Sequence, residues 1–238
     1  MLALAGCAAT GPVTATAEIS NDDPMESVNR AIFGANMTVD RAVVRPVAQV
    51  YRDAIPAEIR TGVRNVTANL KEPGITANDL LQGNVNRAWT SARRFAVNTT
   101  AGVAGTMDLA SKWDLPPHST DFGQTLAVWG IGEGPFVELP ALGPSSVRDA
   151  VGTAVNMIFD PFALAGIPVL TYIGYGRSAA DFLDFRAAHI DDLDELERSA
   201  MDFYSSLKSI YRQHRQHEID EAKRAASNKR SGYASATN

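Results

Sequence analysis

The sequence predicts an all-α protein, a single domain of many short and medium amphipathic helices joined by glycine- and proline-rich loops. Apolar residues recur at spacings of three and four in several separate segments, which is the spacing of one helix face. Prolines follow these segments and break them up. No internal repeat or second compositional domain is visible, and 238 residues can bury a sizeable core.

The first helix is expected close to residue 22, where a helical domain spanning residues 22–215 begins. Asp23, Pro24 and Glu26 supply an N-cap carboxylate, a proline at the first position and an acid at the third. Apolar residues then form one stripe that we expect to pack on the body: Val28, Ile32, Ala35, Val39 and Val43. Three prolines are each expected to end a helix: Pro46, Pro56 and Pro73.

The middle of the chain changes character. Residues 84–99 are amphipathic, with apolar residues together and three arginines elsewhere on the surface: Arg87, Arg93 and Arg94. From residue 123 to 144 glycine and proline recur every few positions, which predicts an irregular apolar loop with a short strand near 136–139. Ser146 and Asp149 are expected to cap the next helix, which runs to about Phe159.

The C-terminal part shows one regular apolar stripe, which predicts a single long helix docked on the body: Leu193, Leu196, Ala200, Phe203, Leu207 and Ile210. The acidic run from Asp191 to Glu197 could hold a cation, but its leucines fit the stripe, so a solvated helix face is favoured. Beyond Arg215 the stripe fades, and residues 216–238 are expected to be a disordered polar tail.

Charge and hydropathy exclude several classes of protein. A net charge of −5 with no concentrated basic face argues against a nucleic-acid partner. No stretch reaches the ~20 apolar residues of a spanning helix. The longest charge-free stretch after the N-terminal segment, residues 161–176, is interrupted by prolines and glycines, which is typical of interfacial or re-entrant elements.

No pattern indicates catalysis, a cofactor or a metal site. No glycine is followed by lysine, so the nucleotide-binding loop is missing, and the glycines of 130–134 have the wrong spacing for a dinucleotide loop. The serines at 145 and 146 lack the Gly-x-Ser-x-Gly elbow. His214, His217 and Glu218 lie near each other, but not in the order of a zinc protease, so solvated histidines are favoured.

The single cysteine follows Leu4, Ala5 and Gly6, which is the small-residue pattern of a bacterial lipoprotein processing site. This predicts a lipid anchor on Cys7, with residues 1–7 a remnant signal peptide and residues 8–21 a flexible tether. The alternative is an ordinary cysteine. The apolar stretch before Cys7 is shorter than a complete signal peptide requires, which fits a misplaced start codon or a trimmed leader.

Several ordered blocks between residues 22 and 215 closely resemble the MlaA family, also called VacJ, of outer-membrane phospholipid-transport lipoproteins. The blocks are Asp23–Arg30, Val44–Ala48, Asn69–Pro73, Asn78–Gly83, Arg94–Thr99, Asp121–Leu126 with Trp129–Gly130, and Gly134–Phe136 continuing through Leu139–Pro140 to Gly143–Asp149. The ordered set is far more specific than any single block. The sequence departs from the family pattern at Gly74, where a larger residue is usual, and in its short leader.

The resemblance implies a ring-like, mostly helical protein embedded in the periplasmic leaflet of a Gram-negative outer membrane. Such proteins enclose an amphipathic channel, remove mislocalised phospholipids from the outer leaflet, work beside a trimeric porin and pass lipid to the periplasmic carrier MlaC. They are not enzymes. The rival functions are a lipid-anchored envelope hydrolase, which needs a reactive Ser, His or Glu cluster in a cleft, and a structural envelope lipoprotein, which predicts a closed polar surface.

We place eight residues as candidates beside the lipid path. Phe33 and Met37, with Asn36 nearby, form a second apolar pair on the first helix that could serve as a gate or be ordinary core. The remaining candidates belong to the glycine-rich stretch that we expect to be a bent wall of the path: Phe122, Gly123, Leu126, Trp129 and Phe136.

Overall fold

A computed structural model describes residues 23–164 and 168–236, and Cys7 therefore lies outside the described residues. The described part is mostly helical, as predicted, with one small antiparallel hairpin. The elements are α1 (Glu26–Val39), α2 (Arg45–Ala54), α3 (Ala57–Leu81), α4 (Val85–Thr100), α5 (Phe122–Val128), β1 (Phe136–Leu139), β2 (Gly143–Ser146), α6 (Val147–Ile158), α7 (Pro161–Leu164), α8 (Pro168–Ala188), α9 (Ile190–Ser199) and α10 (Phe203–Ala236).

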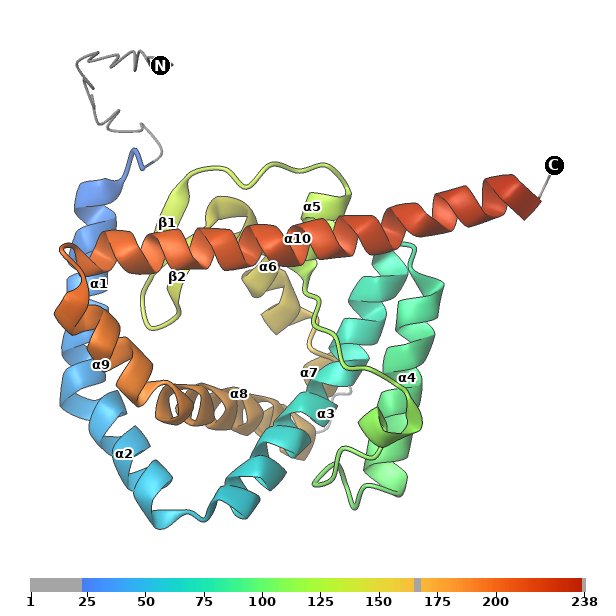
Figure 1. Cartoon of the computed structure of the whole chain (residues 1–238), viewed down its shortest axis with the longest axis horizontal. Coiled ribbons are helices and arrows are strands. Elements are labelled where there is room, and N and C mark those ends of the chain that lie inside the picture. Colours follow the sequence, from blue (N-terminus) through green and yellow to red (C-terminus); the bar gives the residue numbers. More distant parts are fainter. Residues whose placement is uncertain (1–22, 165–167, 237–238) are drawn as a thin grey trace, which may run out of the picture.

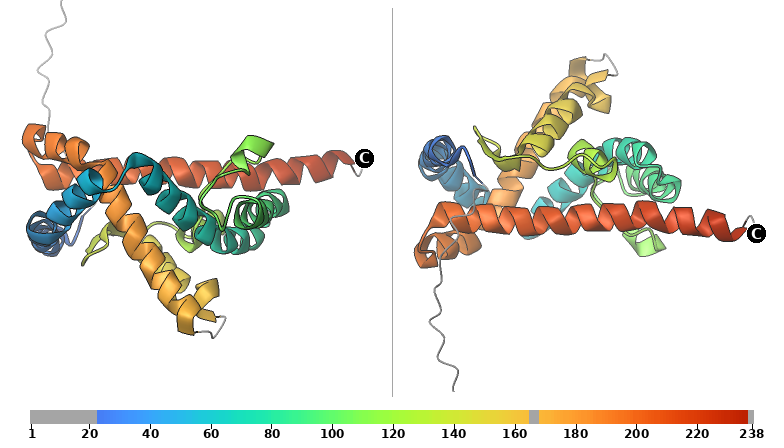
Figure 2. Two further views of the ribbon diagram at one scale, coloured as in Figure 1. Left: turned by 90° about the horizontal axis from the view of Figure 1, so that it is seen from below. Right: turned by 90° about the horizontal axis from the view of Figure 1, so that it is seen from above.

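The helices follow one another around a ring (Figure 1). The helices α1, α2 and α9 form one side, the α3–α4 pair forms the opposite side, and α10 runs along a third. The short hairpin and α6 lie between α1 and α5. Figure 2 shows that α7 and the adjoining parts of α6 and α8 project from the layer that the other helices form.

Pro46 was predicted to end a helix, but a helical arm continues through it. A five-residue π-helical segment, Asp40–Val44, joins α1 to α2, and the Arg45 amide donates to the Asp40 carbonyl five residues back. The wider turn precedes a proline that cannot donate, so the chain continues as one helical arm from Glu26 to Ala54. The arm begins with Met25 in the N-cap position, where Asp23 was expected.

Pro73 also lies inside a helix, because α3 continues from Ala57 to Leu81. The prediction for Pro56 is confirmed, because α2 ends at Ala54 just before it. Beside Pro73, Glu72 is almost fully buried and accepts a hydrogen bond from Arg94 Nε of α4 at 2.6 Å. Arg94, predicted to be on the surface, is 3% exposed and also donates to the Leu115 carbonyl at 2.6 Å. The packing of α3 on α4 and this buried pair stabilise the helix across its proline.

The glycine-rich stretch is more regular than predicted. The expected strand is present as β1, paired with β2 so that Phe136 faces Ser146, but α5 replaces the first part of the expected loop. Asp121 is the N-cap of α5 and accepts from the Gln124 amide at 2.9 Å. As predicted, Ser146 caps α6 and accepts from the Asp149 amide at 3.2 Å.

Two helices replace the single C-terminal helix that the stripe predicted. The break falls at Ala200, and Asp202 then caps the start of α10 through the Ser205 amide at 3.3 Å. The acids of α9 are not merely solvated, because they pair with arginines of the α1–α2 arm. These pairs are Arg41–Glu197, Arg45–Asp194 and Arg52–Asp191.

The helix α10 continues through residues expected to be a disordered tail. Ile219 and Ala222 are each 3% exposed, so the buried stripe passes Arg215 at helical spacing instead of ending there. This part of the stripe was missed because a buried arginine and an alanine replace the leucines of the earlier turns.

Candidate functional site

A cavity of about 720 Å³ opens between α3, α5, α6, α7 and α8. The surface it exposes is mostly apolar, with Ile75 and Leu81 from α3, Phe122 from α5, and Phe159 and Leu164 beside α7. Its charged lining includes Lys71, Asp160 and Arg177. These three lie close together, because Arg177 pairs with Asp160 and donates to the carbonyl of Leu70, the residue before Lys71. The cavity therefore combines an apolar wall with a charged border.

A second cavity of about 680 Å³ lies between α3 and α8. Lys71 and Arg177 line both cavities, so the two adjoin at these residues, and we call them together the groove. The lining of the second cavity is charged, with added aromatic rings: Arg64, Asp181, Phe182, Asp184, Phe185 and His189. The groove thus runs from an apolar half to a charged half, and both volumes are typical of small-molecule sites.

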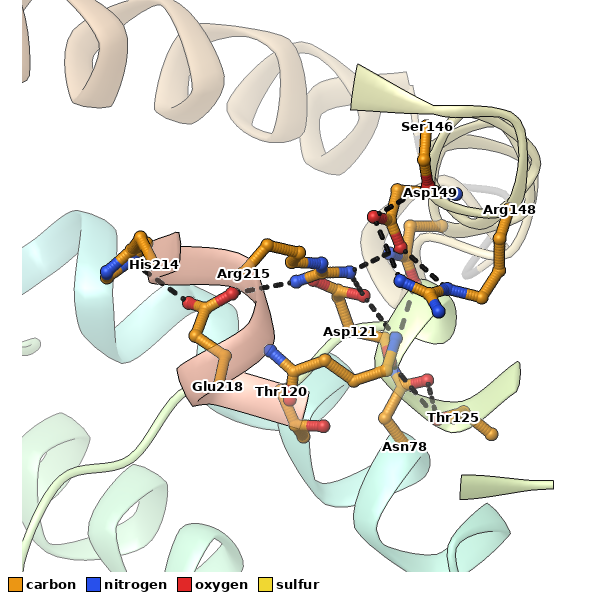
Figure 3. Close-up of polar contacts among 12 residues, drawn as sticks. Asn78, Thr120, Asp121, Thr125, Ser146, Arg148, Asp149, His214, Arg215 and Glu218 are labelled. Atoms are coloured by element: carbon orange, nitrogen blue, oxygen red, sulfur yellow. Dashed lines mark hydrogen bonds and ion pairs between the residues drawn. The ribbon is translucent and has the colours of Figure 1, made fainter. Parts of the chain in front are cut away.

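A cluster of ion pairs (Figure 3) adjoins the apolar half of the groove, because one of its residues, Asp121, lines that half. Arg215 of α10 donates to Asp121 and to Asp149 at distances of 2.8 and 2.9 Å. Arg148 donates to the same Asp149 carboxylate at 3.1 Å, and the Tyr211 hydroxyl donates to it at 2.8 Å. We call these five residues the Arg215 cluster. It ties α10 to the N-termini of α5 and α6.

Electrostatic interactions within the cluster favour the ionised form of Asp149. Burial by itself would raise the pKa of Asp149, but the hydrogen bonds from Arg215 and Arg148 outweigh it and hold that pKa well below its usual range. Close helix packing makes the geometry possible, because a Cβ on Gly152 would lie 2.4 Å from the Gly123 amide nitrogen. The cluster is a clamp that sets the position of Phe122, the next residue after the N-cap Asp121.

Along the outer wall of the ring, apolar side chains are exposed and polar ones are buried, which is the reverse of a water-soluble helical protein. On the α1–α2 arm, the stripe that was predicted to pack on the body faces outward, with Val28 49% and Val39 56% exposed. The inward face carries Asn29, which is 1% exposed and donates to the Phe136 carbonyl at 3.1 Å. Other large apolar side chains are exposed along the arm and on α3 and α4: Val43, Val47, Val50, Ile59, Val85 and Trp89.

This reversal excludes an ordinary water-facing helical arm, in which the apolar stripe would be buried. Contiguous exposed apolar surface marks contact with a membrane or a partner. Within the described residues, no helix is both long and apolar enough to cross a membrane. The exposed apolar face of the arm is suited to contact with an apolar phase.

Of the eight candidate residues, Phe122 lines the groove. Trp129 lies beside it, because their rings meet edge to face at 5.9 Å, and the Trp129 Nε1 donates to the Leu81 carbonyl at 3.0 Å. Gly123 is buried against the Arg215 cluster, and Leu126 is buried in α5. These residues support or border the apolar half of the groove.

The other four candidates join α1 to the hairpin and α10. Phe33 packs edge to face on Phe203 and Tyr204, at 5.6 and 5.5 Å between centroids. Asn36 donates to the Leu139 carbonyl at 3.0 Å and accepts from the Ala141 amide at 2.9 Å. Met37 is half-buried and Phe136 is 1% exposed, and none of these four borders the groove. A gate at Phe33 and Met37 stays a prediction.

Sequence reasoning missed the residues of α3 that line the groove. Lys71, Ile75, Asn78 and Leu81 follow one another at helical spacing and could have been recognised as one face. The expectation that Pro73 ends a helix divided this face in two. The charged residues of α8 gave no signal of their own, because their partners on α3 are more than a hundred positions away.

Comparison with known proteins identifies the family. A model of a family described as "MlaA lipoprotein" matches residues 21–218, which is most of the chain. The chain belongs to the MlaA lipoprotein family. The MlaA relatives include proteins named "Intermembrane phospholipid transport system lipoprotein MlaA" in Shigella flexneri and Escherichia coli, each 33% identical over 216 residues, or 87% of this chain and 81% of the relative.

A further MlaA protein of the same name, from Haemophilus influenzae, is 30% identical over 93% of this chain and 88% of its own length. A solved structure described as "Structural basis for maintenance of bacterial outer membrane lipid asymmetry" superposes with a TM-score of 0.72 at 30% identity. The superposition covers 83% of this chain and 98% of the solved chain. The MlaA resemblance and the mostly helical fold that the sequence predicted are thus confirmed.

Proposed function

We propose that the chain is a non-enzymatic lipoprotein of the Gram-negative outer membrane that removes mislocalised phospholipid from the outer leaflet and passes it toward the periplasm. The observation that carries this function is the combination of an apolar outer wall with an amphipathic groove between α3 and α8. The names of the relatives, which refer to phospholipid transport and outer-membrane lipid asymmetry, support it.

The apolar arm supports a position in the periplasmic leaflet. Moving apolar surface from water into lipid is favourable by about 25 cal/mol per Å², so exposed valines such as Val43, Val47 and Val50 favour immersion. A lipid on Cys7 would hold the protein at this membrane, and two or more acyl chains are needed for stable anchoring. We place the ring in one leaflet, with the groove open to lipid.

The groove supports a lipid conduit. A diacyl lipid has on the order of thirty methylenes, and at ~0.8 kcal/mol each their exposure to water would cost tens of kcal/mol. The apolar half, with Leu81, Phe122 and Leu164, can shield acyl chains, and the charged half can accept a headgroup. Since no nucleotide-binding loop is present in the sequence, direction must come from partners, for which we propose a trimeric porin and the carrier MlaC.

The geometry does not favour the hydrolase alternative. Ser91 and His118 lie 3.4 Å apart, and Asp79 lies 2.7 Å from the same His118. Both contacts use Nε2, whereas a catalytic triad needs the acid on one ring nitrogen and the serine on the other. Ser91 is fully buried and could not reach a substrate. A purely structural lipoprotein would have no use for an apolar-lined groove.

The decisive experiment introduces a charge into the apolar half of the groove. Leu164 is 62% exposed, so Leu164→Glu should leave folding intact and oppose the passage of acyl chains. In cells that depend on this protein, we expect more outer-leaflet phospholipid and greater detergent sensitivity. Gln213→Glu on the exposed face of α10 is the matched control. Equal behaviour of the two variants at equal protein levels would refute the conduit.

A further inference from the structure

The charged half of the groove is electrically balanced. Each of three cations that border the groove has a carboxylate partner that borders it too. The pairs are Arg64–Asp184 at 2.9 Å, Lys71–Asp181 at 2.5 Å and Arg177–Asp160 at 2.5 Å. Since no cation of these pairs is in excess, the groove is not a general trap for anions.

The three pairs differ in how firmly the protein holds them. Arg177 and Asp160 are 14% and 16% exposed, and Arg177 also donates to the Leu70 carbonyl at 2.7 Å. The Arg64 side chain is 53% exposed, but its partner Asp184 is only 7% exposed and accepts from the Tyr51 hydroxyl as well. The Arg177–Asp160 pair and the Asp184 carboxylate are therefore part of the protein framework.

The third pair is open to solvent. The Lys71 side chain is 44% exposed and the Asp181 side chain 39% exposed. Lys71 borders both cavities, so the pair lies where the apolar half meets the charged half. An exposed pair of this kind contributes little to stability, so a ligand can replace it at little cost.

We propose that the Lys71–Asp181 pair is a headgroup subsite that selects zwitterionic phospholipids over anionic ones. The inference rests on the proposed function. When a zwitterionic lipid replaces the contact between the two side chains, its phosphate binds the Lys71 ammonium and its ammonium binds the Asp181 carboxylate. Every charge then keeps a partner. An anionic headgroup without an amine leaves Asp181 unpaired and places its charge near Asp184 and Asp160.

The test measures which lipids the purified full chain retains. The protein is incubated with vesicles of equal phosphatidylethanolamine and phosphatidylglycerol with identical acyl chains, and bound lipid is quantified by mass spectrometry. We expect phosphatidylethanolamine to be enriched about three- to fivefold, from a pair energy near 1 kcal/mol. The enrichment should fall as salt is added, because the pair is exposed.

Two variants assign the preference to the pair. Asp181→Asn should bind both lipids about equally, since the ammonium loses its partner while Lys71 still binds phosphate. Glu195→Gln, which removes an acid from an exposed pair with Arg198 outside the groove, should retain the full preference. Equal or anionic-selective binding by the unmodified protein, or an unchanged preference in Asp181→Asn, overturns the headgroup subsite alone. Absence of bound lipid overturns both this subsite and the conduit.

Discussion

The Lys71–Asp181 pair of the groove and the Arg215 cluster are built from the same kinds of charged group, yet their surroundings differ. In the groove the two side chains are 44% and 39% exposed, whereas Arg215 and Asp149 are 10% and 8% exposed. Water can replace either partner in the first case and neither in the second. The degree of burial therefore separates an exchangeable binding pair from a structural clamp.

Removal of Arg215 should have the largest effect on stability. Arg215→Ala removes one of the two arginines that pair with buried Asp149 and the arginine that pairs with Asp121. Breaking a buried pair typically costs about 3–5 kcal/mol, and because Arg148 still pairs with Asp149 we expect a loss near the lower end of that range. Denaturant unfolding of the purified protein in detergent should show this loss. Arg198→Ala, which breaks an exposed pair on α9, is the control and should cost less than about 1 kcal/mol. Equal losses for the two variants would contradict the clamp.

Glu138 extends the comparison to a buried carboxyl that pairs with no cation among the described residues. It is 3% exposed, and burial raises its pKa to about 7 although a hydrogen bond from Asn36 opposes the shift. The folded state therefore keeps a proton that the unfolded chain loses near pH 4.5. The free energy of unfolding should fall as pH rises from 4.5 to about 7 and then level off.

Glu138→Gln removes this dependence. At roughly 1.4 kcal/mol per pKa unit, the variant should be more stable than the unmodified protein by about 3 kcal/mol at pH 8. The advantage should vanish well below pH 4.5, where the carboxyl is protonated in both the folded and the unfolded states. Thermal unfolding across this pH range is the measurement. A constant difference at all pH values would show that folding does not raise the pKa of Glu138.

The packing that brings the clamp together can be tested without changing a charge. Gly152→Ala places a Cβ 2.4 Å from the Gly123 backbone, and such overpacking typically costs about 1–3 kcal/mol. Gly62→Ala is the matched control, since it also lies within a helix but a Cβ there meets nothing within 4 Å. It should gain about 0.5–1 kcal/mol from helix propensity. A cost for Gly62→Ala as large as that for Gly152→Ala would contradict this account.

Local signals in the sequence predicted much of the fold. The helical class, the strand at 136–139 and the Ser146 cap were all visible, because spacing and capping act within a few residues. The errors arose where tertiary contacts override local preference. Pro73 stays in a helix that packs on α4, and Pro46 follows a π-helical turn. Neither compensation leaves a signal in the neighbouring residues.

The candidate site was harder to predict for a related reason. The apolar stripe on the first arm was recognised, but an amphipathic pattern does not state which face meets water and which meets the protein. In this chain the polar face is buried, through residues such as Asn29 and Asp40, which bonds Arg186 of α8 at 2.8 Å. The ion pairs of the groove join α3 to α8, and only the folded chain shows such distant partners.

The smallest effect on stability is expected for the groove pair itself. Asp181→Asn removes a charge that is 39% exposed, and water and the Thr67 hydroxyl, 3.4 Å away, remain to solvate the amide. The change in unfolding free energy should stay within about 1 kcal/mol, against several for Arg215→Ala. Denaturant unfolding of both variants under one condition makes the comparison direct. A loss of several kcal/mol would place Asp181 among the clamps and would contradict its role as an exchangeable headgroup subsite.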